Sequence, residues 1–345
     1  MSPFYSFNEE AAADLLKWFR EYGVAYPWAD SPDPWGIWVS EVMLQQTTVR
    51  AVEPRYRRWM ERFPTPESLA AADEEEVLRE WEGLGYYNRA RNLSSAAREL
   101  PLSYGDRIPE DPAELRRLHG IGEYIAAAVA SFAFGKRVAA IDANGKRIAQ
   151  RLSAREKWNR ELESAFRNTV VELMPLENPG EMNAAIMQLG QIICTSRAPR
   201  CPECPLASCC AALVGGIQNS IPVRRRQEVI RTKTKVAILL DRGMVLIQKR
   251  ESGIGRGLWV FPAESDIEDL KIGWRLEEFL PEQVHAYTKF RETLESRVYR
   301  RREGAAGMPY EWLSDVLFVS MEKLLEMPMP TAYRRIAASL PEYID

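Results

Sequence analysis

Residues 194–210 read CTSRAPRCPECPLASCC and contain all five cysteines of the 345-residue chain. Four of them follow the spacing C-x6-C-x2-C-x5-C: Cys194, Cys201, Cys204 and Cys210. A disulfide framework would scatter its cysteines among distant loops, whereas a metal centre needs thiolates that converge on one point. The spacing favours an iron–sulfur cluster, with tetrahedral zinc as the alternative. Cys209 could replace Cys210 as the fourth ligand, and spacing alone leaves this open.

Composition places the chain among ordinary globular proteins, with 46% hydrophobic and 28% charged residues. The net charge of −3 does not indicate nucleic acid, so phosphate binding would need local basic patches and backbone amides. The sequence contains no apolar run of bilayer length and no basic secretory signal at its start. Together with the clustered cysteines, this predicts a cytoplasmic protein without a membrane partner. With only His119 and His285, acid–base chemistry would rest on carboxylates, tyrosine or lysine.

The pattern of apolar residues changes in character after residue 210. Ser6 with Glu9 predicts a capping box for a first helix. Further helices are expected near 38–50, 67–81, 89–99, 112–118, 123–134, 144–152, 160–174 and 181–193. Strands are expected at 236–240, 244–249, 294–301 and 315–319, and a terminal helix at 330–340. The sequence therefore predicts a mainly α domain over 1–212, a linker over 213–230 and a smaller α+β domain over 231–345.

The sequence LHGIG at 118–122 lies between two predicted helices. Gly120 and Gly122 permit a tight turn, and their amides together with the following helix N-terminus can hold a phosphate. Alone, such a turn is more often structural. Twenty residues beyond Gly122, Asp142 lies in AIDANGKR at 140–147. The return of the chain after helix 123–134 could bring its carboxylate near the hairpin.

A helix–hairpin–helix followed by this aspartate and the cysteine array resembles the endonuclease III superfamily of DNA glycosylases, also called helix-hairpin-helix-GPD. The resemblance implies that Asp142 is the catalytic carboxylate and that the four spaced cysteines hold a [4Fe–4S] cluster. Bifunctional members carry a lysine shortly after the hairpin, which forms a Schiff base with the sugar. Here that position is Tyr124. The resemblance therefore implies hydrolysis of the base without strand cleavage.

The segments WVSEVMLQQT at 38–47 and GLGYY at 83–87 resemble the MutY-type adenine DNA glycosylase family. RARNL at 89–93, Asn183-Ala184 and QLG at 188–190 carry the same resemblance. The family acts in base-excision repair and removes adenine paired with 8-oxoguanine or guanine in double-stranded DNA. The resemblance implies the same activity here, in a monomer.

In this resemblance Glu41 would protonate adenine at N7 and then activate water, and an apolar wall around it would help raise its pKa. Asp142 would stabilise the cationic sugar, with Tyr124 and Asn144 supporting the two carboxylates. Gln46 and Tyr86 match residues that wedge into the duplex as adenine flips out. The DNA contacts implied are Gln46, Tyr86, Arg89, Arg91, Gly120, Gly122, Thr288 and Lys289. Taken alone, Glu41 would more often be a solvated helix carboxylate.

Residues 236–250, GLWVFP at 257–262 and MPTA at 329–332 resemble the Nudix-like domain with which the family recognises 8-oxoguanine. The glutamate helix of a Nudix hydrolase is absent from the sequence, so pyrophosphatase activity is not expected. Tyr287-Thr288-Lys289 replaces the family's Phe-Ser-His loop. Thr288 keeps a hydroxyl donor for the oxidised base, and Lys289 adds a charge for phosphate.

Several residues depart from the family pattern near the expected site. His119 replaces a proline, Ala143 and Gly145 change the loop at Asp142, and Ala29 replaces a polar residue near the base pocket. These departures keep two alternatives open. One is a related glycosylase for another base, such as thymine in a G·T mismatch. The other is a non-catalytic lesion-binding protein, which the presence of Glu41 and Asp142 argues against.

Overall fold

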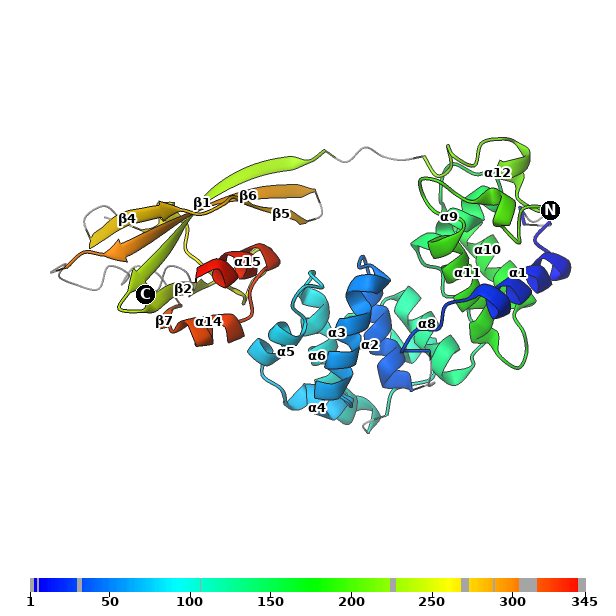
Figure 1. Cartoon of the computed structure of the whole chain (residues 1–345). Coiled ribbons are helices and arrows are strands. Elements are labelled where there is room, and N and C mark those ends of the chain that lie inside the picture. The colour runs from blue at the N-terminus through cyan, green and yellow to red at the C-terminus, as the bar shows by residue number, and fades with distance from the viewer. Residues whose placement is uncertain are drawn as a thin grey trace. The chain divides into compact units, whose positions relative to one another are not determined.

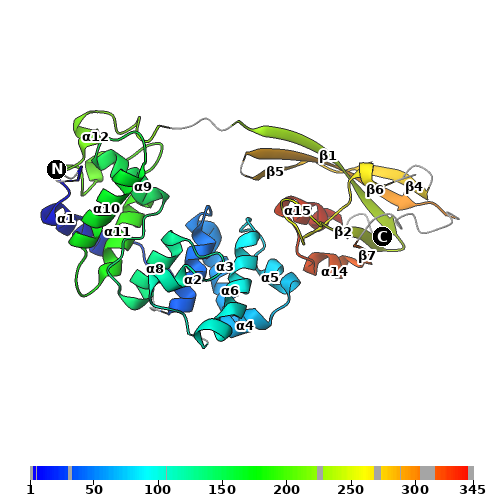
Figure 2. The same ribbon diagram turned by 180° about the vertical axis from the view of Figure 1, so that it is seen from behind.

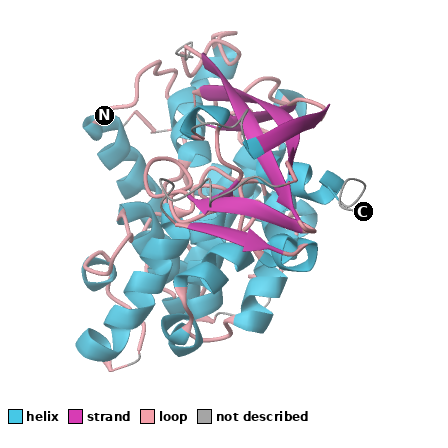
Figure 3. Cartoon of the chain, turned by 90° about the vertical axis from the view of Figure 1, so that its left-hand side faces the viewer, coloured by secondary structure: helices cyan, strands magenta, loops and turns pink. Residues whose placement is uncertain are grey.

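The computed structural model describes residues 3–4, 6–29, 33–105, 107–223, 228–267, 273–287, 289–303 and 315–340. The chain divides into two compact units, Met1–Ala70 with Asn92–Arg225 and Ala71–Arg91 with Arg226–Asp345. The first unit is helical, and the described strands all belong to the second (Figure 1, Figure 3). The expected fold class, mainly α followed by α+β, is confirmed. The domain boundaries expected at 212 and 231 stay a prediction. The two compact units are not continuous in sequence, because residues 71–91 group with the C-terminal residues.

The first unit is built from two groups of helices that α8 and α11 join. Helices α2, α3, α7 and α8 pack in one group, and α1, α9, α10, α11 and α12 pack in the other. No helix among the described residues is long and apolar enough to span a membrane. The helices of this unit are α1 (Glu9–Tyr22), α2 (Pro34–Leu44), α3 (Val49–Arg62), α4 (Pro66–Ala71), α6 (Asn88–Tyr104), α7 (Pro112–Leu115), α8 (Glu123–Phe134), α9 (Ala143–Leu152), α10 (Arg160–Leu173), α11 (Pro179–Ile192) and α12 (Ala211–Val214), with a short 3-10 helix at Cys201–Glu203.

Several helix predictions were wrong in their boundaries. The helices expected at 89–99 and 112–118 end at Tyr104 and Leu115. The first helix is capped by Asn8, whose side chain accepts from the Ala11 N–H, so the capping box at Ser6 does not form. The helix expected over 38–50 ends at Leu44, because Gln46 has a φ of 56°, and α3 begins after it. The helix expected over 67–81 is two helices, because the Asp73 side chain caps a new helix at the Glu76 N–H.

Helix α2 is buried on nearly every side because its sequence, PWGIWVSEVML, is apolar all round. Pro34 occupies its first turn, and the Asp33 side chain accepts from the N–H groups of Trp35 and Gly36. Its one ionisable side chain is Glu41. The fold therefore takes this carboxyl into the interior of the helical unit.

In the described residues, the second unit combines a mixed sheet with the helices α5, α14 and α15. Strand β1 pairs with β6 in parallel and with β2 antiparallel, giving the order β3-β2-β1-β6-β4, while β5 pairs with β6 and β7 with β2. The strands expected at 236–240, 244–249, 294–301 and 315–319 are present, although β1 and β6 begin earlier, at Ile230 and Phe290, and β3, β4, β5 and α14 were missed. The elements are α5 (Glu74–Glu80), β1 (Ile230–Asp241), β2 (Met244–Lys249), β3 (Trp259–Val260), β4 (Trp274–Phe279), β5 (Gln283–Tyr287), β6 (Phe290–Arg301), β7 (Val316–Val319), α14 (Met321–Glu326) and α15 (Thr331–Ser339).

Alternate residues of β1 face two separate apolar clusters, as the period of a strand requires. Val236, Ile238 and Leu240 pack with α14 and α15 on one face of the sheet (Figure 2). Ala237 and Leu239 pack with residues that include Trp274 on the other. The helices α14 and α15 therefore cover one face of this α+β unit.

Asn183 on α11 satisfies three polar groups in the interior of the helical unit. It is 1% exposed, and its Oδ1 accepts from the Ala140 N–H at 2.9 Å. Its Nδ2 donates to Ser131 Oγ at 2.8 Å and to the Val138 carbonyl at 2.9 Å. These bonds hold residues 138–140, the segment that leads to Asp142, against α8 and α11.

Replacing Asn183 with alanine should lower the free energy of unfolding by about 2–4 kcal/mol, since it leaves buried donors and acceptors without partners. Urea unfolding followed by helical circular dichroism measures this change. Asn168→Ala, at an exposed position of α10, is the matched control and should remain near wild type. Equal midpoints for the two variants would contradict the prediction.

Candidate active site

Two helices of the first unit bring Glu41 and Tyr124 together. Glu41 comes from α2 and is 4% exposed, and Tyr124 comes from the first turn of α8, which packs against α2. The Tyr124 hydroxyl donates to Glu41 Oε2 at 2.6 Å. Around Tyr124 lie the apolar residues Ala127, Ala128 and Met187. The expected support of Glu41 by Tyr124 therefore has a direct geometric basis.

Burial is the main reason that the pKa of Glu41 rises to about 7. The hydrogen bond from Tyr124 is the second largest effect and lowers this pKa, and the negative charge of Asp142 raises it by a smaller amount. The pKa of Tyr124 is itself raised by burial and by the same two carboxyls, so its hydroxyl keeps its proton. This upward direction for Glu41 is the one expected from the sequence. A carboxyl of this pKa exchanges a proton near neutral pH.

Asp142 is the N-cap of α9 and accepts several hydrogen bonds. Its Oδ1 accepts from the Gly145 N–H at 2.7 Å, and its Oδ2 accepts from Asn144 Nδ2 at 2.7 Å. Burial raises the pKa of Asp142, and these donors, with the positive charge of Arg147, oppose that rise. The site thus contains two carboxyls in unlike surroundings, one in an apolar wall and one facing donors.

Arg147 links Asn144 to the segment that carries the cysteines. Its Nη2 donates to Asn144 Oδ1 at 2.8 Å and to the Gly190 carbonyl at 2.7 Å. Its Nε donates to the Cys194 carbonyl at 2.8 Å. Gly190 has no room for a side chain, because a Cβ there would lie 2.4 Å from the Cβ of Asn144. Asn144 is therefore held from two sides, which fixes its amide toward Asp142.

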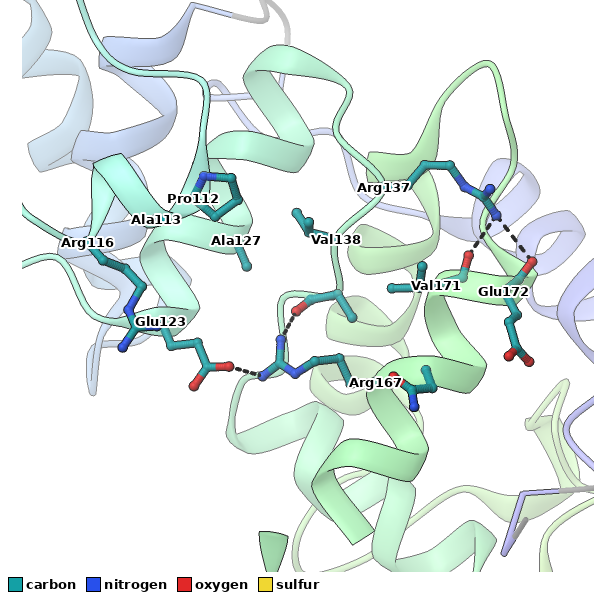
Figure 4. Close-up of a pocket in the computed structure, with 12 residues that line it drawn as sticks. Pro112, Ala113, Arg116, Glu123, Ala127, Arg137, Val138, Arg167, Val171 and Glu172 are labelled. Carbon is teal, nitrogen blue, oxygen red and sulfur yellow. Dashed lines mark hydrogen bonds and ion pairs between the residues drawn. The ribbon is translucent and has the colours of Figure 1, made fainter. Parts of the chain in front are cut away.

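Arg167 and Arg137 hold the chain that runs into Asp142. Arg167 donates to the Ala139 carbonyl at 2.6 Å and pairs with Glu123 at 3.0 Å (Figure 4). Arg137 donates to the Val171 carbonyl at 2.8 Å, near the end of α10. Both arginines line a surface pocket between α7, α8 and α10, and no predicted catalytic side chain lines it. This pocket is consequently separate from the pair of carboxyls.

The hairpin at 118–122 connects α7 and α8 with two glycines of different character. Gly120 has a φ of +78°, and a Cβ there would lie 2.5 Å from the Cβ of Asn92, so both backbone and packing require glycine. Gly122 is the N-cap of α8, and a Cβ there would meet nothing within 4 Å. Packing does not require glycine at 122. No side chain caps the start of α8, so its first N–H groups are open to a ligand.

The four spaced cysteines line one cavity, together with Arg151 and apolar residues. Cys209 does not line it, and its Sγ donates to the Leu206 carbonyl at 3.4 Å. Burial raises the pKa of the Cys204 thiol to about 12, so an electropositive group would be needed to hold it as thiolate. Among the described residues, no three His, Cys, Asp or Glu side chains are grouped tightly enough for one metal ion. The four spaced thiols therefore share one space, in which a metal centre would find its ligands.

Gln46 and Tyr86 share an unusual backbone conformation. Their φ angles are 56° and 48°, in the left-handed region that non-glycine residues rarely adopt, and both side chains are exposed. Gln46 follows α2 in the helical unit, whereas Tyr86 belongs to the second unit. Arg89 lies 5.5 Å from the centroid of the Tyr86 ring and donates to the Leu84 carbonyl at 3.1 Å. Burial lowers the pKa of Arg89 to about 10.

The remaining predicted DNA contacts differ in how they are engaged. Arg91 pairs with Glu74 at 2.7 Å and also donates to the Arg256 carbonyl, so its guanidinium makes internal contacts. Lys289 is exposed, with its ammonium 5.6 Å from the centroid of the Phe290 ring. Thr288 lies outside the described residues. The roles of these residues stay predictions.

Sequence reasoning missed the arginines and the asparagine that hold the catalytic segment. Arg147 and Arg167 read as ordinary helix cations, and Asn183 was noted only as part of a family motif. A weak signal existed for Arg147, because an arginine on the buried face of an amphipathic helix needs several acceptors. Their partners lie far away in the chain, so spacing alone could not identify them.

Residues 39–172 match the family described as HhH-GPD superfamily base excision DNA repair protein. The chain is similar to two solved structures over its helical part. A thermostable thymine-DNA glycosylase is 27% identical, covers 59% of this chain and 95% of its own, and has a TM-score of 0.55. A trapped covalent intermediate of endonuclease III with DNA is 26% identical, covers 60% and 95%, and has a TM-score of 0.53.

Curated relatives extend the similarity into a longer part of the chain. The adenine DNA glycosylase of Buchnera aphidicola (subspecies Baizongia pistaciae) is 32% identical over 252 residues, which are 72% of each chain. That of Mycobacterium tuberculosis is 37% identical over 227 residues, 65% of this chain and 74% of the relative. The human adenine DNA glycosylase is 37% identical over 209 residues, and the match spans only 38% of its length. With the paired carboxyls and the hairpin, these similarities show that the chain belongs to the adenine DNA glycosylase family, within the HhH-GPD superfamily of base-excision repair proteins.

Proposed function

We propose that this protein is a monofunctional adenine DNA glycosylase that removes adenine paired with 8-oxoguanine or guanine from duplex DNA. The observation that carries the proposal is the buried Glu41 carboxyl, with its pKa of about 7, hydrogen-bonded to Tyr124 and close enough to Asp142 to feel its charge. An N-glycosidic bond breaks when the leaving base is protonated and the cationic sugar is stabilised. This pair of carboxyls can supply both.

In this mechanism Glu41 begins protonated and gives its proton to N7 of the flipped adenine. The carboxylate that results takes a proton from the attacking water, and Tyr124 stabilises that carboxylate by its hydrogen bond. Asp142 is the carboxylate that faces the sugar. The donors at Gly145 and Asn144 favour its ionised form, which stabilises positive charge at the anomeric carbon.

Tyr124 also bears on the outcome of the reaction. It occupies the position at which bifunctional relatives have a lysine, and a phenol cannot form an imine with the sugar. Its raised pKa keeps it a neutral donor to Glu41. The proposed products are therefore free adenine and an intact strand with an abasic site.

The remaining parts of the proposal concern DNA and its lesion. Backbone amides at Gly120 and Gly122 would bind a phosphate, and Gln46 and Tyr86 would enter the duplex beside the flipped base. The loop at 287–289 would contact the oxidised guanine and its strand. We place the enzyme in the cytoplasm as a monomer.

The four cysteines that line the cavity would hold a [4Fe–4S] cluster. When bound, the cluster cross-links the residues between Cys194 and Cys210, and it supplies no step of base removal. Arg147 and Arg151 both donate to the Cys194 carbonyl, and Arg151 also donates to its Sγ at 3.1 Å. These donors would favour the thiolate form and join the cluster loop to α9.

Excision of thymine from a G·T mismatch is the second candidate function. It is favoured by the similarity in fold to a thymine-DNA glycosylase, at 27% identity. The curated adenine relatives are more similar, at 30–39% identity. The adenine reaction is therefore the first proposal.

Single-turnover excision on duplexes with adenine opposite 8-oxoguanine, guanine or cytosine, and on a G·T duplex, tests the proposed function. Strand breaks should appear only after alkali and fastest for adenine opposite 8-oxoguanine. Asp142→Asn should abolish excision and keep DNA binding, because asparagine preserves the helix cap. Thymine release without adenine release would establish the second function, and breaks without alkali would reject the monofunctional assignment.

Glu41→Gln should abolish excision and stabilise the protein at alkaline pH. The raised pKa means that folded wild type binds more protons than unfolded chain between pH 4.5 and about 7, so its stability falls as pH rises through this window. Glutamine avoids the buried charge, which predicts a gain of roughly 3 kcal/mol at pH 8 and under about 1 kcal/mol at pH 5.

Unfolding midpoints measured at both pH values test this difference. Glu177→Gln, at an exposed site, is the matched control and should show no such pH dependence. A gain that is equal at pH 5 and pH 8 would show that ionisation of the buried carboxyl is not its cause.

Cys210→Ser should abolish visible absorbance and cluster iron and sulfide, whereas Cys209→Ser should keep them. The reason is that Cys210 lines the same cavity as Cys194, Cys201 and Cys204, whereas Cys209 does not. Iron, sulfide and zinc analysis of the two purified variants measures the outcome. The reverse result would exchange the fourth ligand, and zinc without iron in wild type would reject the cluster.

A further inference from the structure

The loop that carries Tyr86 is tied to the last helix of the chain by one bidentate ion pair. In the second unit, Arg334 of α15 donates from Nε and Nη2 to the two oxygens of Glu82, both at 2.8 Å. The two side chains are 21% and 19% exposed, so water screens the pair only in part. Glu82 immediately precedes Gly83-Leu84-Gly85-Tyr86. A second tie comes from Tyr87, whose hydroxyl donates to the Met329 carbonyl at 3.4 Å.

Arg334 is itself fixed at the junction of α14 and α15. Its Nη1 donates to the Leu324 carbonyl at 3.2 Å and the Leu325 carbonyl at 2.9 Å, and its Nη2 also donates to the Met327 carbonyl. The guanidinium thus uses its donors on the end of α14 and on Glu82 together. Because the Arg334 side chain is fixed in this way, a movement of α14 or α15 would also move Glu82.

The same helix contacts the strand that leads into the expected lesion-reading loop. Helix α15 packs against β5, whose last residue is Tyr287. Tyr333, the residue before Arg334, is 3% exposed, and the Arg250 guanidinium lies 5.8 Å from the centroid of its ring. Tyr333 and Tyr287 each interact with the charges of Arg250 and Glu292. One helix therefore contacts the strand that enters the 287–289 loop and, through Arg334, the loop that carries Tyr86.

We propose that the Glu82–Arg334 pair is a positioning device that couples the end of β5 at Tyr287 to the Tyr86 loop, so that contact of Tyr287 or Lys289 with the strand opposite adenine determines how firmly Tyr86 is held in place. The inference rests on the proposed function, because it assigns a wedge role to Tyr86 and a lesion-reading role to the 287–289 loop. Tyr86 has a φ of 48°, which is strained for a residue other than glycine, so outside contacts help to keep this conformation.

The coupling predicts that loss of the Glu82–Arg334 pair lowers the preference for adenine opposite 8-oxoguanine more than it lowers the rate of excision opposite guanine. Glu82→Gln keeps the shape of the side chain but removes its charge, and Arg334→Met removes the guanidinium. Both should reduce the ratio of single-turnover rates opposite 8-oxoguanine and guanine roughly five-fold or more, while excision opposite guanine stays near wild type. The double variant should lose no more than either single variant, and Glu82→Asp should recover part of the ratio.

Lys323→Met is the matched control, because Lys323 is an exposed cation of the neighbouring helix α14. Its ratio should equal that of wild type. Equal loss on both substrates in the Glu82 and Arg334 variants would show a merely structural pair and overturn the proposal, as would an unchanged ratio.

Amide hydrogen exchange over residues 83–87 provides a readout that does not need catalysis. Exchange should be faster in both variants than in wild type, and duplex containing 8-oxoguanine should slow it in wild type only. If wild type releases no adenine, the proposed function fails, and this exchange measurement still decides the coupling. Equal exchange in wild type and variants would reject it.

Discussion

The buried Glu41 carboxyl needs a hydrogen-bond donor, and the hydrogen bond from Tyr124 supplies it inside the helical unit. A carboxyl inside an apolar helix is tolerated only with a proton or a donor beside it. The fold supplies one donor, from the first turn of α8, and packs α2 against α8 so that the distance cannot relax. One donor is too few to hold the group ionised at neutral pH, so burial raises the pKa to about 7. The same constraint explains why α2 is otherwise apolar on every side.

The Asp142 carboxyl, unlike that of Glu41, is surrounded by donors that favour its ionised form. Its carboxyl meets a backbone N–H and an amide, and Arg147 adds a positive charge behind them. Because the surroundings of the two carboxyls differ in this way, Glu41 favours the protonated form more strongly than Asp142 does. Arg147 also contacts the Cys194 carbonyl, so the geometry at Asp142 depends on the cysteine segment. The cysteine segment and the pair of carboxyls are thereby connected through protein side chains.

Local pattern predicted much of this arrangement. Helix α8 has the expected bounds, and α9 begins one residue before its expected start, because glycines and an N-capping aspartate mark their ends in the sequence. The cavity lined by four cysteines also followed from spacing. What failed were features that depend on contacts over long distances: the break at Gln46, where nothing in a glutamine signals a left-handed backbone, and the acceptors of Arg147. The grouping of residues 71–91 with the C-terminal residues was also missed, because Glu82 and Arg334 are 252 positions apart.

Gln46 and Tyr86 keep a left-handed backbone conformation although neither residue is glycine. Each position costs about 1–3 kcal/mol relative to a relaxed conformation, and glycine would remove that cost. Glycine would also remove the side chain, and both side chains are exposed and make little contribution to a core. At Tyr86 the strained backbone is held by Arg89. The Arg89 guanidinium lies against the Tyr86 ring and donates to the Leu84 carbonyl. Strain maintained at exposed side chains is expected where the side chain, rather than the turn, is needed for binding, which is the role that the family resemblance assigns to both residues.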